Sequence, residues 1–451
     1  MSQTMTAPLP MRRALHTAPG LLRLRQGIIA LLALVLALTA YNGYAFLNHV
    51  AQTIGHDAVP SIVAAEEIRT TLGYAHTELA NAFLTNEGKN GPAMRAYTSA
   101  MQQAHDSLLT AAQNITYGDE ERKPILALMT LLAEYERLVG AASMVGHYGD
   151  AMVQADVLMR TRILPAASAL DQANFSHLDA AYRQFGAEAR VRQLLVIGLA
   201  LLLSLALIET QWHLYRHYRR VFNPSLLAGT LVLVALIGSY LNMNGAAMSS
   251  IRSAKEDAFD SVHALTRARS VAYDANALET LYLLENLHPD NQTKLTAQFN
   301  AAAHAIWHGS VSAEGNLPAD LSVLKGEGML GDELANITFE GEAAAATRTL
   351  NGWRNYVAID ARIRKLESEG HHAEAVALCI GTREGESDWA FGQFNDALSD
   401  TLKINQTAFD QDSERAITVV DRMRYLALAM LLVPLLAGFW GLRRRIAEFR
   451  A

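Results

Sequence analysis

The sequence has few of the residues that build covalent or catalytic frameworks. Its 451 residues include a single cysteine, Cys379, which excludes an internal disulfide and cysteine-based metal clusters. We expect Cys379 to be a small core residue on a helix. The chain has none of the common nucleotide-binding, metalloprotease or nucleophile motifs. We therefore expect no enzyme activity, cofactor or metal, and we interpret His371 and His372, beside Glu374, as a solvated turn.

Charged residues are also scarce. They make up 18% of the chain, against 51% for apolar residues, whereas soluble domains average about 25% charged residues. This composition predicts membrane spans, which need about 20 mainly apolar residues each. The second apolar run is short, because only 16 residues separate Arg192 from Glu209. We therefore extend this run to 215 and place Glu209 and Trp212 at the membrane interface. The four predicted spans are 26–47, 193–215, 221–243 and 424–442.

The basic residues predict the orientation of the spans. Segments 1–25, 216–220 and 443–451 hold 11 arginines and one acid. The two long segments are acidic: 48–190 has 10 basic and 16 acidic residues, and 245–420 has 14 and 26, a joint charge of −18. The positive-inside rule therefore predicts that both termini are cytoplasmic and that 48–192 and 244–423 lie outside the cytoplasm.

The cytoplasmic arginines have two interpretations. They set the orientation, and they could also contact anionic lipid or an acidic partner surface. The candidates for such contacts are Arg216, Arg219, Arg220, Arg443, Arg444 and Arg445.

The two long segments resemble each other at an offset of 200 residues. Eight of the 30 positions in 57–86 are identical to those in 257–286, including Arg69 and Arg269. Because the pattern of span, long segment and span also recurs, we expect an internal duplication. An arginine repeated on the first helix of each segment could hold a ligand carboxylate. The alternative for Arg69 and Arg269 is an ordinary ion pair on the helix surface.

Apolar periodicity predicts an all-α fold. A stripe of residues spaced by three or four begins at Ile62, and GKNGP at 88–92 ends that helix. Further breaks are expected before Pro124, at 369–372 and 381–387, and in a long loop at 308–339. The pattern predicts two tandem extracytoplasmic four-helix bundles on four transmembrane helices, with the outer helices of each bundle continuous with spans.

This layout resembles the four-helix-bundle sensing domains of bacterial chemoreceptors and sensor kinases. Two stretches are similar to a more particular group, the four-span tandem-bundle membrane proteins of actinobacteria. They are LMRTRILPAA at 158–167, and the run from Trp353 to Leu378 that contains WRNY and DARIRKL. The turn GHYGD at 146–150 lacks the proline typical of that group. One member relays between an extracytoplasmic amino-acid-binding lipoprotein and a cytoplasmic Ser/Thr kinase.

The resemblance implies a protein of the bacterial plasma membrane that senses and relays a signal. Its expected partners are membrane lipids, an extracytoplasmic binding protein or small ligand, and a cytoplasmic kinase-type effector. A homo-oligomer is compatible with the sequence, and no nucleic-acid partner is expected. The alternative function is a structural or assembly subunit of an envelope complex that senses no ligand. A transporter is disfavoured because the spans hold few ionisable residues and no broken-helix pair.

Overall fold

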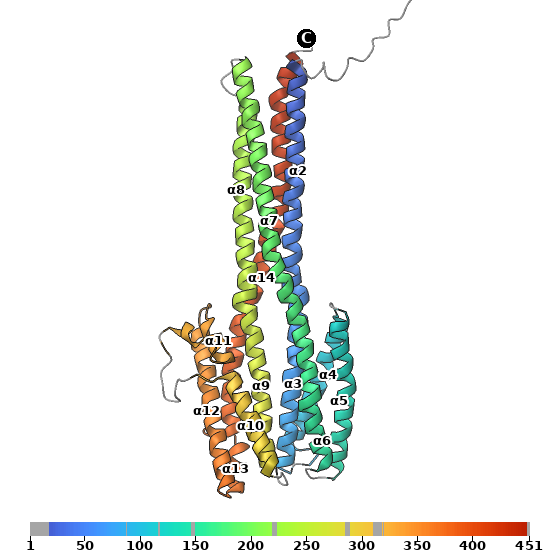
Figure 1. Ribbon diagram of the computed structural model, residues 1–451, viewed down its shortest axis with the longest axis vertical. Helices are drawn as coiled ribbons and strands as arrows, with labels where there is room; N and C mark the ends of the chain where they lie inside the picture. Colours follow the sequence, from blue (N-terminus) through green and yellow to red (C-terminus); the bar gives the residue numbers. More distant parts are fainter. Residues whose placement is uncertain are drawn as a thin grey trace, which may run out of the picture. The chain divides into compact units, whose positions relative to one another are not determined.

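The computed structural model describes residues 18–86, 88–115, 118–145, 149–218, 223–284, 289–309, 318 and 320–448. Every regular element in this part of the chain is helical (Figure 1). The chain divides into two compact units. Unit 1 comprises Met1–Thr53, Ala181–Ile251 and Ser413–Ala451, and unit 2 comprises Ile54–Ala180 and Arg252–Asp412.

Unit 1 contains the apolar parts of four long helices. These are α2 (Ala18–Gln52), α7 (Leu164–Tyr218), α8 (Pro224–Arg252) and α14 (Ser387–Glu448). Each is long and apolar enough to cross a membrane. Leucines such as Leu31, Leu194 and Leu231 are more than 60% exposed, as is expected of side chains that face lipid. The four predicted spans are confirmed as membrane-type helices, although the described part of the third begins at 223.

Close packing and one ion pair join the helices of unit 1. Gly229 of α8 lies against Ala437 of α14, where a larger residue would collide. Glu209 of α7, which we expected at the interface, accepts a hydrogen bond from Arg25 Nη2 of α2 at 2.9 Å. A polar residue beside an apolar run therefore has a partner on a neighbouring helix.

Unit 2 holds two groups of helices. The first group has α3 (Val59–Leu84), α4 (Pro92–Gln113), α5 (Asp119–Val145), α6 (Asp150–Leu158), the π-helical η2 (Met159–Ile163) and the beginning of α7. The predicted stripe is confirmed, because Ile62, Ile68, Leu72 and Leu79 are all fully buried. Ile68, Leu72 and Leu79 pack with Tyr135 and leucines of α5 in one core. Each helix thus hides one apolar face against the others.

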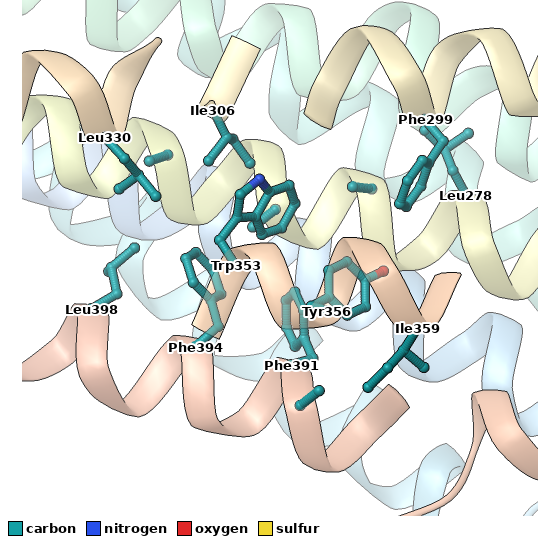
Figure 2. Close-up of a cluster of buried hydrophobic side chains, with 14 of the residues drawn as sticks. Leu278, Phe299, Ile306, Leu330, Trp353, Tyr356, Ile359, Phe391, Phe394 and Leu398 are labelled. Atoms are coloured by element: carbon teal, nitrogen blue, oxygen red, sulfur yellow. The ribbon is translucent and has the colours of Figure 1, made fainter. Parts of the chain in front are cut away.

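The second group contains η3 (Ser253–Phe259, π-helical), α9 (Asp260–Leu283), α10 (Pro289–Ile306), η4 (Leu321–Leu324), α11 (Met329–Ala335), α12 (Glu342–Ser368), α13 (His372–Cys379) and the beginning of α14. Its core is aromatic (Figure 2). The Trp353 and Phe394 rings lie 5.1 Å apart, and Trp353 and Tyr356 lie 5.3 Å apart. Gly352 lets α12 approach the backbone of Phe394 on α14, since an added Cβ would lie 2.9 Å from its Cα.

Two expectations about the helix limits were wrong. The loop expected at 308–339 contains η4 and α11, whose Leu330 and Leu334 are buried. A seven-residue helix is too short to show periodicity in the sequence. The break expected at 117–124 is shorter than predicted, because α5 already begins at Asp119. Three acidic residues in its first turn favour a helix start there.

Helices α3 and α9 lie side by side within unit 2 (Figure 1). Thr70 and Ser270 share a hydrogen bond of 2.9 Å between their hydroxyl groups. Thr280 donates a hydrogen bond to Asn81 Oδ1, also at 2.9 Å. A Cβ added to Gly73 would lie only 3.2 Å from Tyr273 Cβ. The small residue at position 73 therefore allows the two helices to approach closely.

Candidate functional site

The predicted pair Arg69 and Arg269 does not form one site. Arg69 Nη2 lies 3.5 Å from Asp274 Oδ2, so this α3 residue forms an ion pair with α9. Arg269 donates to Ser399 Oγ of α14, and burial lowers its pKa. Both guanidinium groups therefore already contact groups of the protein itself. Their role in holding a ligand carboxylate stays a prediction.

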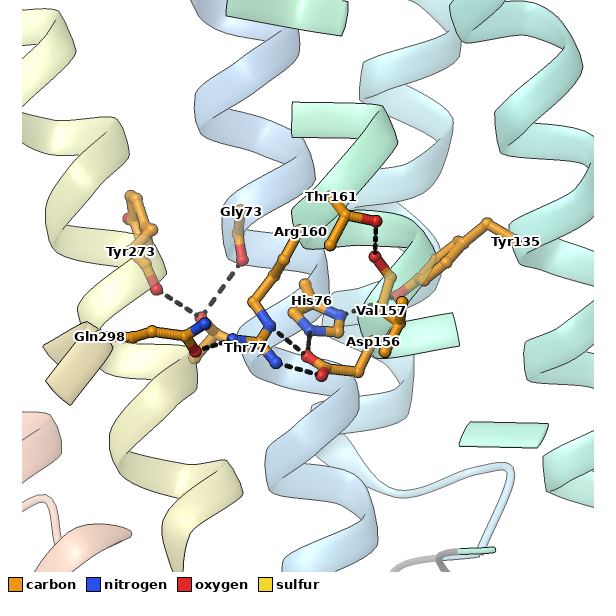
Figure 3. A network of polar contacts seen from close by, with 10 residues as sticks. All are labelled: Gly73, His76, Thr77, Tyr135, Asp156, Val157, Arg160, Thr161, Tyr273 and Gln298. Atoms are coloured by element: carbon orange, nitrogen blue, oxygen red, sulfur yellow. Dashed lines mark hydrogen bonds and ion pairs between the residues drawn. The ribbon is translucent and has the colours of Figure 1, made fainter. Parts of the chain in front are cut away.

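Arg69 lies beside a polar network that connects the two helical groups of unit 2. Its centre is Asp156 of α6, which is 6% exposed. Asp156 Oδ1 accepts a hydrogen bond from Arg160 Nε at 2.7 Å and lies 3.0 Å from His76 Nε2 of α3 (Figure 3). Burial alone would raise the pKa of Asp156, but the hydrogen bonds with His76 and Arg160 outweigh burial and lower it.

The proton arrangement of His76 follows from its neighbours. Its Nδ1 lies 3.2 Å from the Tyr135 hydroxyl of α5. Burial raises the pKa of Tyr135 well above its ordinary value, so this hydroxyl is protonated. A neutral His76 would accept from Tyr135 at Nδ1 and donate from Nε2 to Asp156. Tyr135, His76 and Asp156 then each have a hydrogen-bond partner.

The network reaches the second group through Arg160 and Asp274. Arg160 Nη1 donates a hydrogen bond to Gln298 of α10 (Figure 3). Burial raises the pKa of Asp274 to about 6, while Arg69, His76 and Arg160 act in the opposite direction. Charges from α3, η2 and α9 therefore interact where the two groups meet. A stimulus that moves one group against the other would disturb this network.

An open groove lies on the first group between α4, α5 and the turn that precedes α4. Its volume is about 560 Å³, and its lining includes Lys89, Met94, Tyr97 and Glu136. Small-molecule sites commonly measure about 300–1,000 Å³. Apolar side chains, a cation and a carboxylate together could bind a small zwitterion or a segment of a partner protein. Neither Arg69 nor Arg269 lines this groove.

A second buried polar cluster went unnoticed in the sequence. Glu66 of α3, Asp171 of α7 and His263 of α9 meet inside unit 2. Nearby Lys255 of η3 is 2% exposed, with its ammonium 2.6 Å from Asp260 Oδ1. No sequence motif connects these residues, because each belongs to a different helix.

The remaining candidates lie at helix ends. Arg216 and Arg443 are exposed on α7 and α14. Arg219 and Arg220 lie outside the described residues, and Arg444 and Arg445 belong to α14. A contact of these arginines with lipid or a cytoplasmic partner stays a prediction.

The polar turn expected at 371–374 forms local ion pairs. His371 lies 3.0 Å from Glu374, and His372 lies 2.8 Å from Glu367. Cys379 is buried, as expected, and its Sγ lies 3.5 Å from Glu279 Oε1.

Comparison with known protein families identifies part of the chain. Residues 50–183 match the family described as the actinobacterial sensor domain. The match runs from the end of α2 into α7 and includes His76, Asp156 and the groove. No curated protein and no solved structure matched the chain. The match supports a sensor role, and the four apolar helices support a membrane protein.

Proposed function

We propose that this protein is a membrane sensor that relays an extracytoplasmic stimulus to a separate cytoplasmic effector. The observation that carries the proposal is the match of residues 50–183 to a sensor domain in a chain with four membrane-type helices. The matched segment ends within α7, which continues as one helix to Tyr218. A stimulus received by the first helical group thus has a direct covalent path into an apolar helix.

The proposal includes an orientation. The arginine-rich segments 1–25, 216–220 and 443–451 are cytoplasmic, and unit 2 lies outside. In this proposal, the output passes through a partner that recognises the arginines of these segments or the membrane-embedded helices. By the resemblance noted above, that partner is a kinase-type effector, and the stimulus arrives as an amino acid or on a binding protein. The chain itself would act as a relay and not as a catalyst.

The proposal also includes an internal duplication into two four-helix bundles. Thr70 and Ser270, 200 positions apart, touch each other. Equivalent positions of two parallel helices meet in this way beside a twofold axis. The π-helical turns η1 (Thr53–Ala58) and η3 recur at nearly the same offset. His76 and Asn276 also lie at equivalent positions, and each contacts a buried tyrosine of the third long helix, Tyr135 or Tyr356.

The relay would use small movements of the long helices. Translations or rotations of about 1–2 Å are typical of signalling between packed helices. Such a movement of α7 relative to α3 and α9 would strain the network around Asp156, because η2 with Arg160 directly precedes α7. π-Helical turns are frequent at functional sites, and η2 directly precedes α7. The stimulus is therefore expected to change the packing around η2 and reach the end of α7.

The relay can be tested with photo-crosslinkers in cells. A crosslinking residue at Arg216 or Arg443 is expected to capture a cytoplasmic protein, with a yield that changes when amino acids are supplied. A crosslinker at Thr110, which is exposed on α4, serves as the matched control and should not capture that protein. A stoichiometric membrane partner whose capture never responds to amino acids would instead support an assembly subunit.

A further inference from the structure

The cluster of Glu66, Asp171 and His263 has the geometry of a metal site. One potential ligand atom from each of these residues lies within 4.8 Å of the other two. His263 Nε2 is 3.1 Å from Asp171 Oδ1, 3.2 Å from Asp171 Oδ2 and 3.4 Å from Glu66 Oε1. Ligands bound to Zn²⁺ at about 2.0–2.2 Å stand roughly 3.0–3.6 Å apart. The observed separations from Nε2 fall in this range.

Hydrogen bonding within the protein does not satisfy this cluster. Three carboxylate oxygens surround one imidazole nitrogen, which can donate only one proton. Glu66 Oε1 has no hydrogen-bond partner among the described residues, although Glu66 is 4% exposed. Burial, followed by the charge of Asp171, raises the pKa of Glu66 well above its ordinary value, and a hydrogen bond with Thr266 and the charges of Arg267 and Arg69 offset this only in part. An uncompensated buried carboxylate is costly, and a cation would offset that cost.

Two nearby cations of the protein pair with acids outside the cluster. The Lys255 ammonium lies 2.6 Å from Asp260 and 3.6 Å from Asp179. Arg69 pairs with Asp274. In the network around Asp156, by contrast, Arg160 contacts both oxygens of the carboxylate. The two buried histidine–carboxylate sites therefore differ, because Arg160 contacts Asp156 directly, whereas Arg267 and Arg69 act on Glu66 through their charge.

Aromatic side chains fix the imidazole of His263 in place. The Phe175 ring stacks on it at 4.1 Å with an interplanar angle of 8°. The Phe259 ring is also nearly parallel to the His263 ring, with the two ring centroids 6.3 Å apart and an interplanar angle of 15°. Such packing limits rotation of the imidazole, and His263 is only 6% exposed. The ligand atoms are therefore held in position before an ion enters, which lowers the entropy cost of binding it.

We propose that Glu66, Asp171 and His263 bind one divalent transition-metal ion, with Zn²⁺ as the best fit. Three protein ligands of nitrogen and oxygen type leave a fourth position for water, as in open zinc sites. Ca²⁺ takes six to eight oxygen ligands and Mg²⁺ keeps several waters, so neither suits this small buried set. The ion joins α3 and α7 of the first group to α9 of the second. This site does not depend on the proposed relay.

The test uses the full-length protein in detergent after removal of metals with a chelator. Titration with Zn²⁺ is expected to give one bound ion per chain and a rise in melting temperature. Each of three ligand substitutions, His263→Gln, Asp171→Asn and Glu66→Gln, should lower the affinity for Zn²⁺ by at least about tenfold. Removal of a residue that only hydrogen-bonds to a metal ligand already lowers metal affinity by about that factor. Co²⁺ bound at the site should give ligand-field absorption that the His263→Gln variant lacks.

Two controls separate this site from adventitious binding and from misfolding. His76→Gln alters the other buried histidine–carboxylate site, and His105→Gln alters an exposed pair with Glu136. Both variants should keep the wild-type affinity for Zn²⁺. Circular dichroism identifies any variant that does not fold, and the three ligand variants are independent of one another. Absence of stoichiometric Zn²⁺ from the wild type, or undiminished binding in the folded ligand variants, would overturn the proposal.

Discussion

At the scale of single residues, the buried acids of unit 2 differ in how well they are compensated. Asp156 contacts the guanidinium of Arg160 and the imidazole of His76. Glu333 of α11 is 2% exposed, and its Oε2 has no hydrogen-bond partner among the described residues. Asn405 Nδ2 donates to Glu333 Oε1 at 3.4 Å, and Ser261 also forms a hydrogen bond with this carboxylate. These differences predict opposite dependences of stability on pH.

Glu333 is expected to make the protein less stable at high pH. Burial, and then the charge of Glu342, raise the pKa of Glu333 to about 7. Glu333 in the folded state therefore retains a proton that it loses in the unfolded chain above about pH 4.3. Stability is full below the unfolded pKa and falls as the pH rises through about 7, by about 3 kcal/mol. Glu333→Gln should remove this loss, as measured by unfolding between pH 5 and 8. An unchanged pH profile in this variant would contradict the assignment.

Arg160 is expected to stabilise the fold through the charge of Asp156. Arg160→Ala leaves that buried carboxylate with His76 alone, at a cost of about 2 kcal/mol for a charged hydrogen bond. In an Asp156→Ala background the same change should cost much less. Because the pKa of Asp156 is lowered, this stability is present above the unfolded pKa and is lost as the pH falls through the folded pKa. A double-mutant cycle at pH 7 measures the coupling, and additive effects would argue against it.

At the scale of helices, the sequence predicted what depends on local periodicity. The stripe from Ile62 to Leu79 identified α3, and the apolar runs identified the four long helices. The pairing of Arg69 with Asp274 depends on how α3 packs against α9, which periodicity does not encode. The cluster at His263 was missed for the same reason, because its three residues lie far apart in the chain. Helix α11 was missed because seven residues form too short a stripe.

Gly73 offers a test of the packing between α3 and α9. A Cβ at this position would already lie within 3.2 Å of Tyr273, so Gly73→Leu should overpack the contact and cost about 1–3 kcal/mol. Gly140 of α5 is the matched control, since an added Cβ there meets nothing within 4 Å. Gly140→Leu should be neutral or slightly stabilising, because leucine favours helices more than glycine does. Thermal unfolding of the two variants gives the comparison, and equal melting temperatures would refute close packing at Gly73.

At the scale of the whole molecule, the charge distribution affects which ligands the protein attracts and how it is oriented in the membrane. The segments 48–190 and 245–420 have a joint charge of −18, which disfavours capture of free anions by the general field. An acidic ligand would need local cations, such as Lys89 in the groove, or delivery by a binding protein. In the proposed relay, the arginine-rich segments contact a separate cytoplasmic effector. The direction in which a signal travels therefore depends on which side each segment occupies.

Orientation can be measured with cysteines introduced one at a time after Cys379→Ala. Thr110→Cys on α4 and Ala344→Cys on α12 are at exposed positions of unit 2. A membrane-impermeant thiol reagent should label both in intact cells, because the positive-inside rule places the acidic segments outside. Arg216→Cys and Arg443→Cys are exposed at the ends of α7 and α14 and should react only after the membrane is permeabilised. Labelling of Arg216→Cys in intact cells would show that the orientation is the opposite of the proposed one. Unit 2 would then be cytoplasmic and could not detect an extracytoplasmic stimulus.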